Sequence, residues 1–238
     1  MRSLKRNREK PEARDKFPEL RFLTLQENGE KEMIKNIVFD MGGVLSEYQP
    51  EMVCRHFIPD EAERKAVRTS VFVSPEWILL DMGVITEEYA LARMQARLET
   101  EHERQMAALC LEHWHEYCMW PKEGMAELMR WIKSQGYGIY LCSNAALRLL
   151  SCYQDVLPEP QLFDGIFFSA EEKCMKPQKE MYGHLFERFG LKPEECFFID
   201  DLSHNIQGAR AVGMDGYCFA DGDVEKLKKR LETLNQAD

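Results

Sequence analysis

The sequence lacks the features that would place it in a membrane. None of its apolar stretches approaches the ~18–20 consecutive residues that a spanning helix needs. Its first residues contain no apolar segment of the kind found in secretory signals. We therefore expect a cytoplasmic protein that has no membrane partner.

Positive charge is also in short supply. Lys and Arg number 31 against 41 Asp and Glu, so the formal net charge is −10. A protein with this negative charge repels the phosphate backbone of DNA or RNA, so we expect no nucleic-acid partner. A small anionic substrate is repelled as well, so any phosphate site must create its own positive potential. A cation, a lysine or backbone N–H groups can provide it.

Two familiar motif types are missing. No two of the eight cysteines form a CxxC pair, and Cys142, Cys196 and Cys218 lie inside apolar runs. This placement favours small core residues in a reducing compartment over a disulfide framework. The sequence contains neither GxxxxGK[ST] nor GxGxxG, so it gives no support to a nucleotide-cofactor fold.

What the sequence does contain is a regular alternation of apolar and amphipathic segments. The expected strands are 37–41, 138–143, 165–170, 196–200 and 216–220. The expected helices are 123–135, 145–156, 178–190, 203–212 and 223–234. Near-continuous apolar strands separated by helices predict an α/β fold with a doubly wound parallel sheet, covered on both faces. Such sheets bind ligands at the carboxyl ends of their strands.

The chain divides into three parts by composition. Residues 1–33 are highly charged, which predicts a disordered extension, with a basic interaction arm as the alternative. Residues 48–118 contain several helical stretches and no convincing strand, which predicts an inserted α-helical module. The remaining segments, 34–47 and 119–238, form the predicted α/β core.

Two of the predicted strands end in motifs suited to binding a ligand. In IVFDMGGVL, Asp40 lies at the end of a predicted strand, where a carboxylate could be a nucleophile or a metal ligand. Gly42 and Gly43 let main-chain groups approach a ligand, although an ordinary Asp-Gly turn is the alternative. In IYLCSNA, Ser143 and Asn144 suit phosphate oxygens, and they are equally good helix caps.

Two further motifs carry charge. In CMKPQKEMY, Lys176 precedes a proline and a helix; a lone lysine of this kind is usually a solvated surface residue. In CFFIDDLSHN, Asp200 and Asp201 stand side by side after an apolar strand. Neighbouring carboxylates repel each other and call for a cation, although capping of the next helix is the alternative for one of them.

In this order, the four motifs resemble those of the haloacid dehalogenase-like (HAD) hydrolase superfamily, over nearly all of residues 34–234. The resemblance implies that Asp40 forms a phospho-aspartyl intermediate and that Ser143 binds the phosphoryl group. It also implies that Lys176 balances the negative charge of both. The helical insert resembles the small cap of this family.

A magnesium ion follows from the same resemblance. The family's fourth motif implies that Asp201, with Asp200, holds Mg²⁺, and Asn205 matches a further active-site position. Asp40, a backbone carbonyl near Gly42, waters and a substrate oxygen would complete the oxygen shell that Mg²⁺ prefers.

The activity implied is that of a phosphoric monoester hydrolase. Its substrate would be a small phosphorylated metabolite, with a sugar phosphate among the candidates. The expected substrate contacts come from Gly43, Ser143, Asn144 and Asn205. Positioning and charge neutralisation of this kind are the main needs of phosphoryl transfer. No motif sets the oligomeric state.

The sequence departs from the family at Gly42. A second aspartate usually stands there, where it protonates the leaving group and later activates water, and such help is worth ~10²–10⁴-fold. One hypothesis is a substrate whose leaving group departs with little protonation, such as a sugar 1-phosphate or an acyl phosphate. The other is that Glu47, Glu76 or Asp81 supplies the acid.

Two alternative functions follow from these features. Because glycine offers no acid or base, the chain could be a catalytically weak sugar-phosphate-binding or regulatory protein. A haloacid dehalogenase uses an aspartate without Mg²⁺, and the pair Asp200–Asp201 argues against it.

Trp77 could line the substrate cavity or pack the insert, and we favour packing. We also expect packing for 113–115, because helix residues two apart do not share a face.

Overall fold

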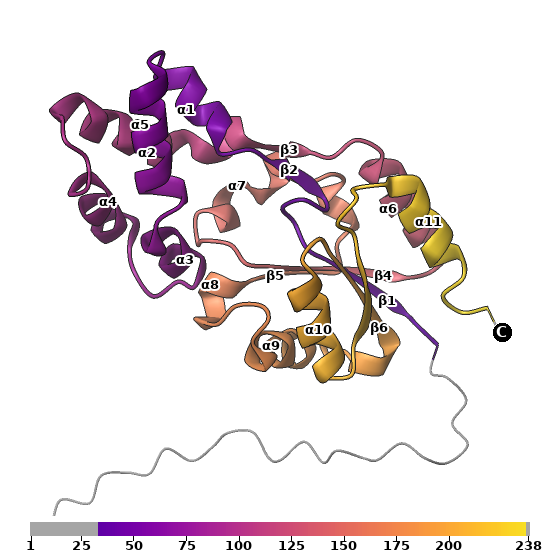
Figure 1. Cartoon of the computed structure of the whole chain (residues 1–238). Coiled ribbons are helices and arrows are strands. Elements are labelled where there is room, and N and C mark those ends of the chain that lie inside the picture. Colours follow the sequence, from indigo (N-terminus) through magenta and orange to yellow (C-terminus); the bar gives the residue numbers. More distant parts are fainter. Residues whose placement is uncertain (1–32, 237–238) are drawn as a thin grey trace, which may run out of the picture. The chain divides into compact units, whose positions relative to one another are not determined.

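The protein, in the form of a computed structural model, is described here over residues 33–236. The disordered extension predicted for 1–33 lies outside these residues except for Met33. Within them, the main feature is a five-stranded parallel sheet in the order β5-β4-β1-β6-β7, with helices packed around it (Figure 1). Its strands are β1 (Asn36–Phe39), β4 (Gly138–Ser143), β5 (Gly165–Phe168), β6 (Cys196–Asp200) and β7 (Asp215–Cys218). The predicted doubly wound α/β fold is confirmed.

Each face of the sheet has its own apolar core. In β1, Ile37 and Phe39 belong to one cluster of buried side chains, whereas Val38 belongs to the other. Successive strand residues point to opposite faces, and all three are fully buried. This explains why the central strands read as continuous apolar runs. The first face is covered by α6 (Met125–Ser134), α7 (Leu149–Val156) and α11 (Val224–Glu232), the second by α9 (Lys179–Phe189) and α10 (Ser203–Ala211).

An inserted group of helices separates β1 from β4 in the sequence. It comprises α1 (Glu51–Phe57), α2 (Glu61–Phe72), α3 (Pro75–Asp81), α4 (Glu87–Gln95) and α5 (Glu101–Cys118). Figure 1 shows these helices together on one side of the sheet. The inserted helical cap of the predicted fold is confirmed, while 48 and 118 as domain limits stay a prediction.

Polar side chains set the starts of four cap helices. Asp60, Ser74, Thr86 and Thr100 each accept a hydrogen bond from a backbone N–H of the first turn. Such a cap is worth about 1 kcal/mol. Thr100 also forms a reciprocal capping box with Glu103. The starts of these four helices are therefore set by residues next to them in the sequence.

Two short strands connect the insert to the core. β2 (Ser46–Tyr48) and β3 (Met119–Pro121) pair in antiparallel register, so the chain enters and leaves the cap through adjacent segments. Neither strand was predicted, because three residues are too few to show an alternating pattern.

The structure corrects two predicted boundaries near the carboxyl ends of β4 and β5. The strand expected over 165–170 ends at Phe168, and the short helix α8 (Ser169–Glu172) follows it. The helix expected from 145 begins at Leu149. The backbone N–H of Ala145 instead donates to Ser169 Oγ at 2.9 Å, which ties the loop after β4 to α8.

The remaining small elements and the cysteines complete the fold. Two 3₁₀ turns, Pro160–Leu162 and Pro193–Glu195, precede β5 and β6. All eight cysteines are free, and only Cys218 is not buried. None of the helices in the described part of the chain has the length and apolar character to cross a membrane.

Candidate active site

The carboxyl ends of three neighbouring strands meet at one cavity of about 330 Å³. Asp40 follows β1, Ser143 ends β4, and Asp200 and Asp201 lie at the end of β6. These strands are parallel and in register, so their ends reach the same edge of the sheet. The predicted site residues that line the cavity are Asp40, Gly42, Gly43, Ser143, Asn144, Lys176, Asp201 and Asn205. Asp200, which is fully buried, lies behind them.

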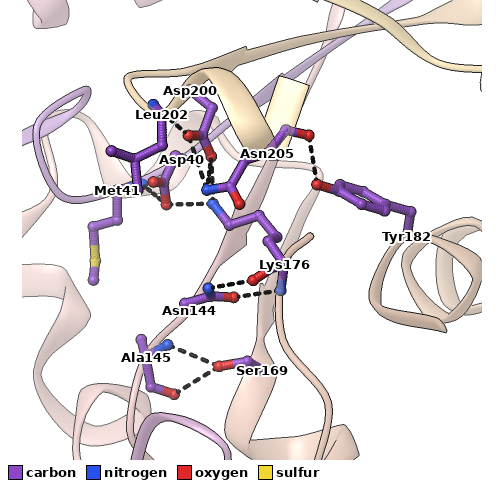
Figure 2. A network of polar contacts seen from close by, with 10 residues as sticks. All are labelled: Asp40, Met41, Asn144, Ala145, Ser169, Lys176, Tyr182, Asp200, Leu202 and Asn205. Carbon is purple, nitrogen blue, oxygen red and sulfur yellow. Dashed lines mark hydrogen bonds and ion pairs between the residues drawn. The ribbon is translucent and has the colours of Figure 1, made fainter. Parts of the chain in front are cut away.

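Lys176 is the centre of the charged network. Its Nζ lies 2.8 Å from Asp40 Oδ1 and 2.7 Å from Asp200 Oδ2, as Figure 2 shows. Burial alone would lower the pKa of Lys176, but the charges of Asp40 and Asp200 outweigh it and raise this pKa. Lys176 is only 2% exposed, so it is not the solvated surface lysine that its motif alone would favour. It is a fixed positive charge at the cavity.

Asp40 is held in place from two sides. Its backbone N–H donates to the carbonyl of Ile199 in β6 at 2.9 Å, and its Oδ1 accepts from the N–H of Met41 at 2.7 Å. Burial raises the pKa of Asp40 to about 6, against the opposing pull of Lys176. At neutral pH the carboxyl group is therefore mainly an anion, as a nucleophile requires.

Asp200 acts as a buried anchor for its neighbours. Besides Lys176, it accepts hydrogen bonds from the Leu202 N–H at 2.9 Å and from Asn205 Nδ2 at 3.0 and 3.1 Å. The carbonyl of Asn205 accepts in turn from the Tyr182 hydroxyl at 2.7 Å (Figure 2). This network fixes the start of α10, so Asn205 reaches the cavity with its side chain already oriented.

The side chain of Asn144 serves the backbone of Lys176. Its Nδ2 donates to the Lys176 carbonyl at 3.0 Å, and its Oδ1 accepts from the Lys176 N–H at 2.8 Å. Both polar ends of this amide are thus engaged, and the side chain holds the second and third motifs together. At the cavity, the backbone of Asn144 rather than its side chain is therefore available to contact a substrate.

The carboxylates at the cavity suit a hard cation. Asp40, Asp200 and Asp201 each offer one oxygen, and these oxygens lie within 4.8 Å of one another. A Cβ on Gly43, whose φ is +77°, would lie 2.7 Å from Asp201 Oδ2, so this glycine leaves room for the carboxyl group. Asn205 Oδ1 is buried and has no hydrogen-bond partner among the described residues, which suits a water held by an ion. Oxygen donors of this kind fit Mg²⁺.

Part of the cavity wall is aromatic. It is formed by Tyr48 of β2, Trp77 of α3 and Trp114 of α5. The Trp77 and Trp114 rings meet edge to face with centroids 5.1 Å apart, and those of Tyr48 and Trp114 are 6.3 Å apart. Trp77 therefore packs the insert, as predicted, and lines the cavity too. Such a wall suits the apolar or flat part of a ligand.

The three acids that the sequence left as alternative proton donors differ in their partners and in whether they line the cavity. Glu47 pairs with Lys122 at 2.5 Å, and the buried Glu76 receives two 2.7 Å hydrogen bonds from Arg97. Asp81, the last residue of α3, lines the cavity. Burial raises the pKa of Asp81 to about 8; a backbone hydrogen bond from Ala146 lowers this pKa, and the charge of Asp40 raises it.

Known proteins resemble this chain in sequence and in fold. Residues 34–213 match the sequence profile of a family described as haloacid dehalogenase-like hydrolase. Over 187 residues, the chain is 29% identical to a sesquiterpene phosphatase of Aspergillus oryzae, which covers 79% of this chain and 90% of that protein. It is 22% identical over 216 residues to a phosphorylated carbohydrates phosphatase of Thermotoga maritima, covering 84% and 96%.

A solved structure shares the fold. It is a HAD family enzyme of Bacteroides thetaiotaomicron in complex with magnesium and inorganic phosphate, with a TM-score of 0.61 and 23% identity. The match covers 77% of this chain and 93% of that one.

Proposed function

From the premise that this chain belongs to the haloacid dehalogenase-like hydrolase family, we propose that it is a Mg²⁺-dependent phosphatase whose nucleophile is Asp40. One observation carries the proposal: a buried lysine lies 2.8 Å from that carboxylate, in a cavity where a second acid, Asp201, and a hydroxyl, Ser143, also converge. Phosphoryl transfer needs this combination of a positioned nucleophile and fixed positive charge.

Each side chain has a distinct part in the proposed reaction. Asp40 attacks phosphorus and becomes a phospho-aspartate, which water then hydrolyses. Lys176 offsets the negative charge of the nucleophile and of the phosphoryl group. Ser143 and the backbone near Gly43 hold the phosphoryl oxygens. Asp40, Asp201 and the carbonyl of Gly42 would hold Mg²⁺, with Asp200 behind them. The ion, when bound, would supply further positive charge for the phosphoryl oxygens.

The substrate we propose is a small phosphomonoester whose alcohol has an apolar or planar part. The wall formed by Tyr48, Trp77 and Trp114 supports this choice, as does the likeness to a sesquiterpene phosphatase. A sugar phosphate, the candidate named from the sequence, stays in the proposal because a relative acts on phosphorylated carbohydrates. We further propose that residues 48–118 form the substrate-selecting cap and that the protein works in the cytoplasm, where buried free thiols are stable.

Release of inorganic phosphate tests this function. Wild-type protein is incubated with a prenyl phosphate, glucose 1-phosphate and p-nitrophenyl phosphate, in Mg²⁺ and in EDTA, beside the variant Asp40→Asn. We expect Mg²⁺-dependent release that Asp40→Asn lowers by at least ~10³-fold, as loss of a nucleophile does. Release that persists in EDTA or in Asp40→Asn would contradict the proposal. Tight binding of these compounds without turnover would instead favour the weakly catalytic, regulatory alternative.

A further inference from the structure

We infer that Asp81, carried by the inserted helices, performs the acid–base function for which Gly42 has no side chain. This inference rests on the proposed phosphatase function and assigns a further catalytic residue to it. Asp81 would give a proton to the leaving oxygen and later take one from the attacking water.

The position of Asp81 is the first support. Of the acids in the inserted helices α1–α5, it is the one that lines the cavity shared with Asp40 and Lys176. The alternatives are committed elsewhere: Glu76 is paired with Arg97, and Glu47 with Lys122. Asp81 has no such basic partner among the described residues.

The second support is the way in which Asp81 is held. Its backbone carbonyl accepts a hydrogen bond from the Ser169 hydroxyl, and Ser169 Oγ in turn accepts a hydrogen bond from the Ala145 N–H at 2.9 Å. Ala146, the next residue, hydrogen-bonds the Asp81 carboxyl group through its backbone. The end of α3 is thus tied, through Ser169, to the loop that directly follows Ser143, where the phosphoryl group is expected.

The third support is that nothing in the backbone requires glycine at position 42. Gly42 does not have a positive φ, and a Cβ built on it would meet only Tyr48 Cβ, at an ordinary 3.8 Å. Gly43 is different, since a Cβ there would meet Asp201 at 2.7 Å. The missing carboxyl group at position 42 is therefore not explained by a lack of space for the first side-chain atom.

The protonation state of Asp81 agrees with the assignment. Burial raises its pKa to about 8, the Ala146 hydrogen bond opposes this rise, and the charge of Asp40 adds to it. Tyr48 lines the same cavity and feels the charge of Asp81, and burial raises the Tyr48 pKa further from neutrality. At neutral pH Asp81 is largely a neutral acid that can donate a proton.

The two steps balance through this one carboxyl group. In the first, an Asp40 oxygen bonds to phosphorus, the phosphorus–oxygen bond of the ester breaks, and the Asp81 proton moves to the departing oxygen to give the alcohol. In the second, a water oxygen bonds to phosphorus and the bond to Asp40 breaks. The proton of that water returns to Asp81, and phosphate leaves.

The test compares two leaving groups in full-length Asp81→Asn. Hexyl phosphate needs protonation to release its alcohol, whereas p-nitrophenyl phosphate releases a stable phenolate. We expect kcat/KM for hexyl phosphate to fall ~10²–10⁴-fold. With p-nitrophenyl phosphate we expect an undiminished initial burst of about one equivalent followed by slow turnover, because only the second step then lacks its base. The exposed acid of α4, Glu88, gives the matched control Glu88→Gln, which should leave the rates with both substrates unchanged.

Two further readouts separate a catalytic role from a structural one. In the wild type, kcat/KM for hexyl phosphate should fall as the pH rises past about 8, because deprotonated Asp81 cannot donate; Asp81→Asn should lack this limb. Adding Gly42→Asp to Asp81→Asn should restore part of the hexyl phosphate activity. A loss of the p-nitrophenyl burst as large as the loss of kcat/KM for hexyl phosphate, or no loss on hexyl phosphate, would overturn the inference. Phosphate release that does not depend on Asp40 would instead contradict the proposed phosphatase function on which the inference about Asp81 rests.

Discussion

At the scale of single residues, the balance of charge around Lys176 governs both stability and chemistry. One buried ammonium group compensates two buried carboxylates, Asp40 and Asp200. Removing one partner of a buried ion pair is costly, since the charges left behind have neither water nor a counterion. The network is therefore most stable with a cation present, whether lysine or metal.

We predict that Lys176→Met lowers the free energy of unfolding by about 3–5 kcal/mol. Urea unfolding in EDTA measures this change. Because Mg²⁺ would supply some of the missing positive charge, adding it should recover part of the loss. The exposed Lys229 gives a control, Lys229→Met, which should cost less than about 0.5 kcal/mol. A Lys176 variant as stable as the wild type in EDTA would show that this charge balance is unimportant.

The position of a side chain could be predicted best from the sequence where it lies at the end of a strand. Asp40, Ser143 and Asp201 are placed by the sheet itself, so their meeting at one cavity follows from the parallel strands. Asp81 could be named only as one of three acids. Its approach depends on how the insert packs against Ser169 of α8, and no local pattern encodes that contact.

At the scale of elements, the contact between α3 and α8 decides where Asp81 lies. Gly83 follows α3 with a φ of +68°, and a Cβ there would lie 2.1 Å from the Ala170 carbonyl oxygen. The backbone of the insert can therefore approach α8 this closely only with glycine at that position.

We predict that Gly83→Ala lowers kcat/KM at least ~10-fold, because a displacement near 1 Å commonly costs still more in catalysis. Gly190→Ala is the matched control: its φ is +64°, yet a Cβ there meets nothing within 4 Å. Urea unfolding should show a loss of about 1 kcal/mol in both variants from the left-handed backbone, and a larger loss in Gly83→Ala because its Cβ also meets the Ala170 backbone. Equal activity in the two variants would mean that the α3–α8 contact does not position Asp81.

Element prediction succeeded for the buried strands and failed where elements are short. β4 and β6 were predicted with the bounds that they have, because a buried, mainly apolar strand of five or six residues is a strong signal. β2 and β3 have three residues each and draw their stability from pairing with each other. The late start of α7 reflects a hydrogen bond to Ser169, which is distant in sequence.

At the scale of the whole molecule, the distribution of cysteines agrees with the expected core. Seven of the eight thiols are buried, and burial raises the pKa of Cys142, Cys118 and Cys196 to about 12. Thiols in this state are protected from oxidants and alkylating reagents, because the reactive thiolate is almost absent.

We predict that Ellman's reagent labels at most one thiol in the native protein, at Cys218, and all eight in guanidinium chloride. Cys218→Ser should abolish the native reaction and keep seven thiols reactive after unfolding. Fewer than eight reactive thiols in the unfolded, unreduced protein would reveal a disulfide and contradict the predicted reducing environment.

The pairing of β2 with β3 has a practical consequence for engineering. Because Tyr48 and Met119 face each other across the ladder, about seventy residues begin and end at almost the same point in space. A stretch with this geometry is an exchangeable cassette: caps from relatives could be grafted between these two positions while the catalytic sheet keeps its own connections. On the roles proposed above, swapping this module would change substrate preference and leave Asp40 in place, but because the module also carries Asp81, the grafted cap must bring its own acid or be combined with Gly42→Asp.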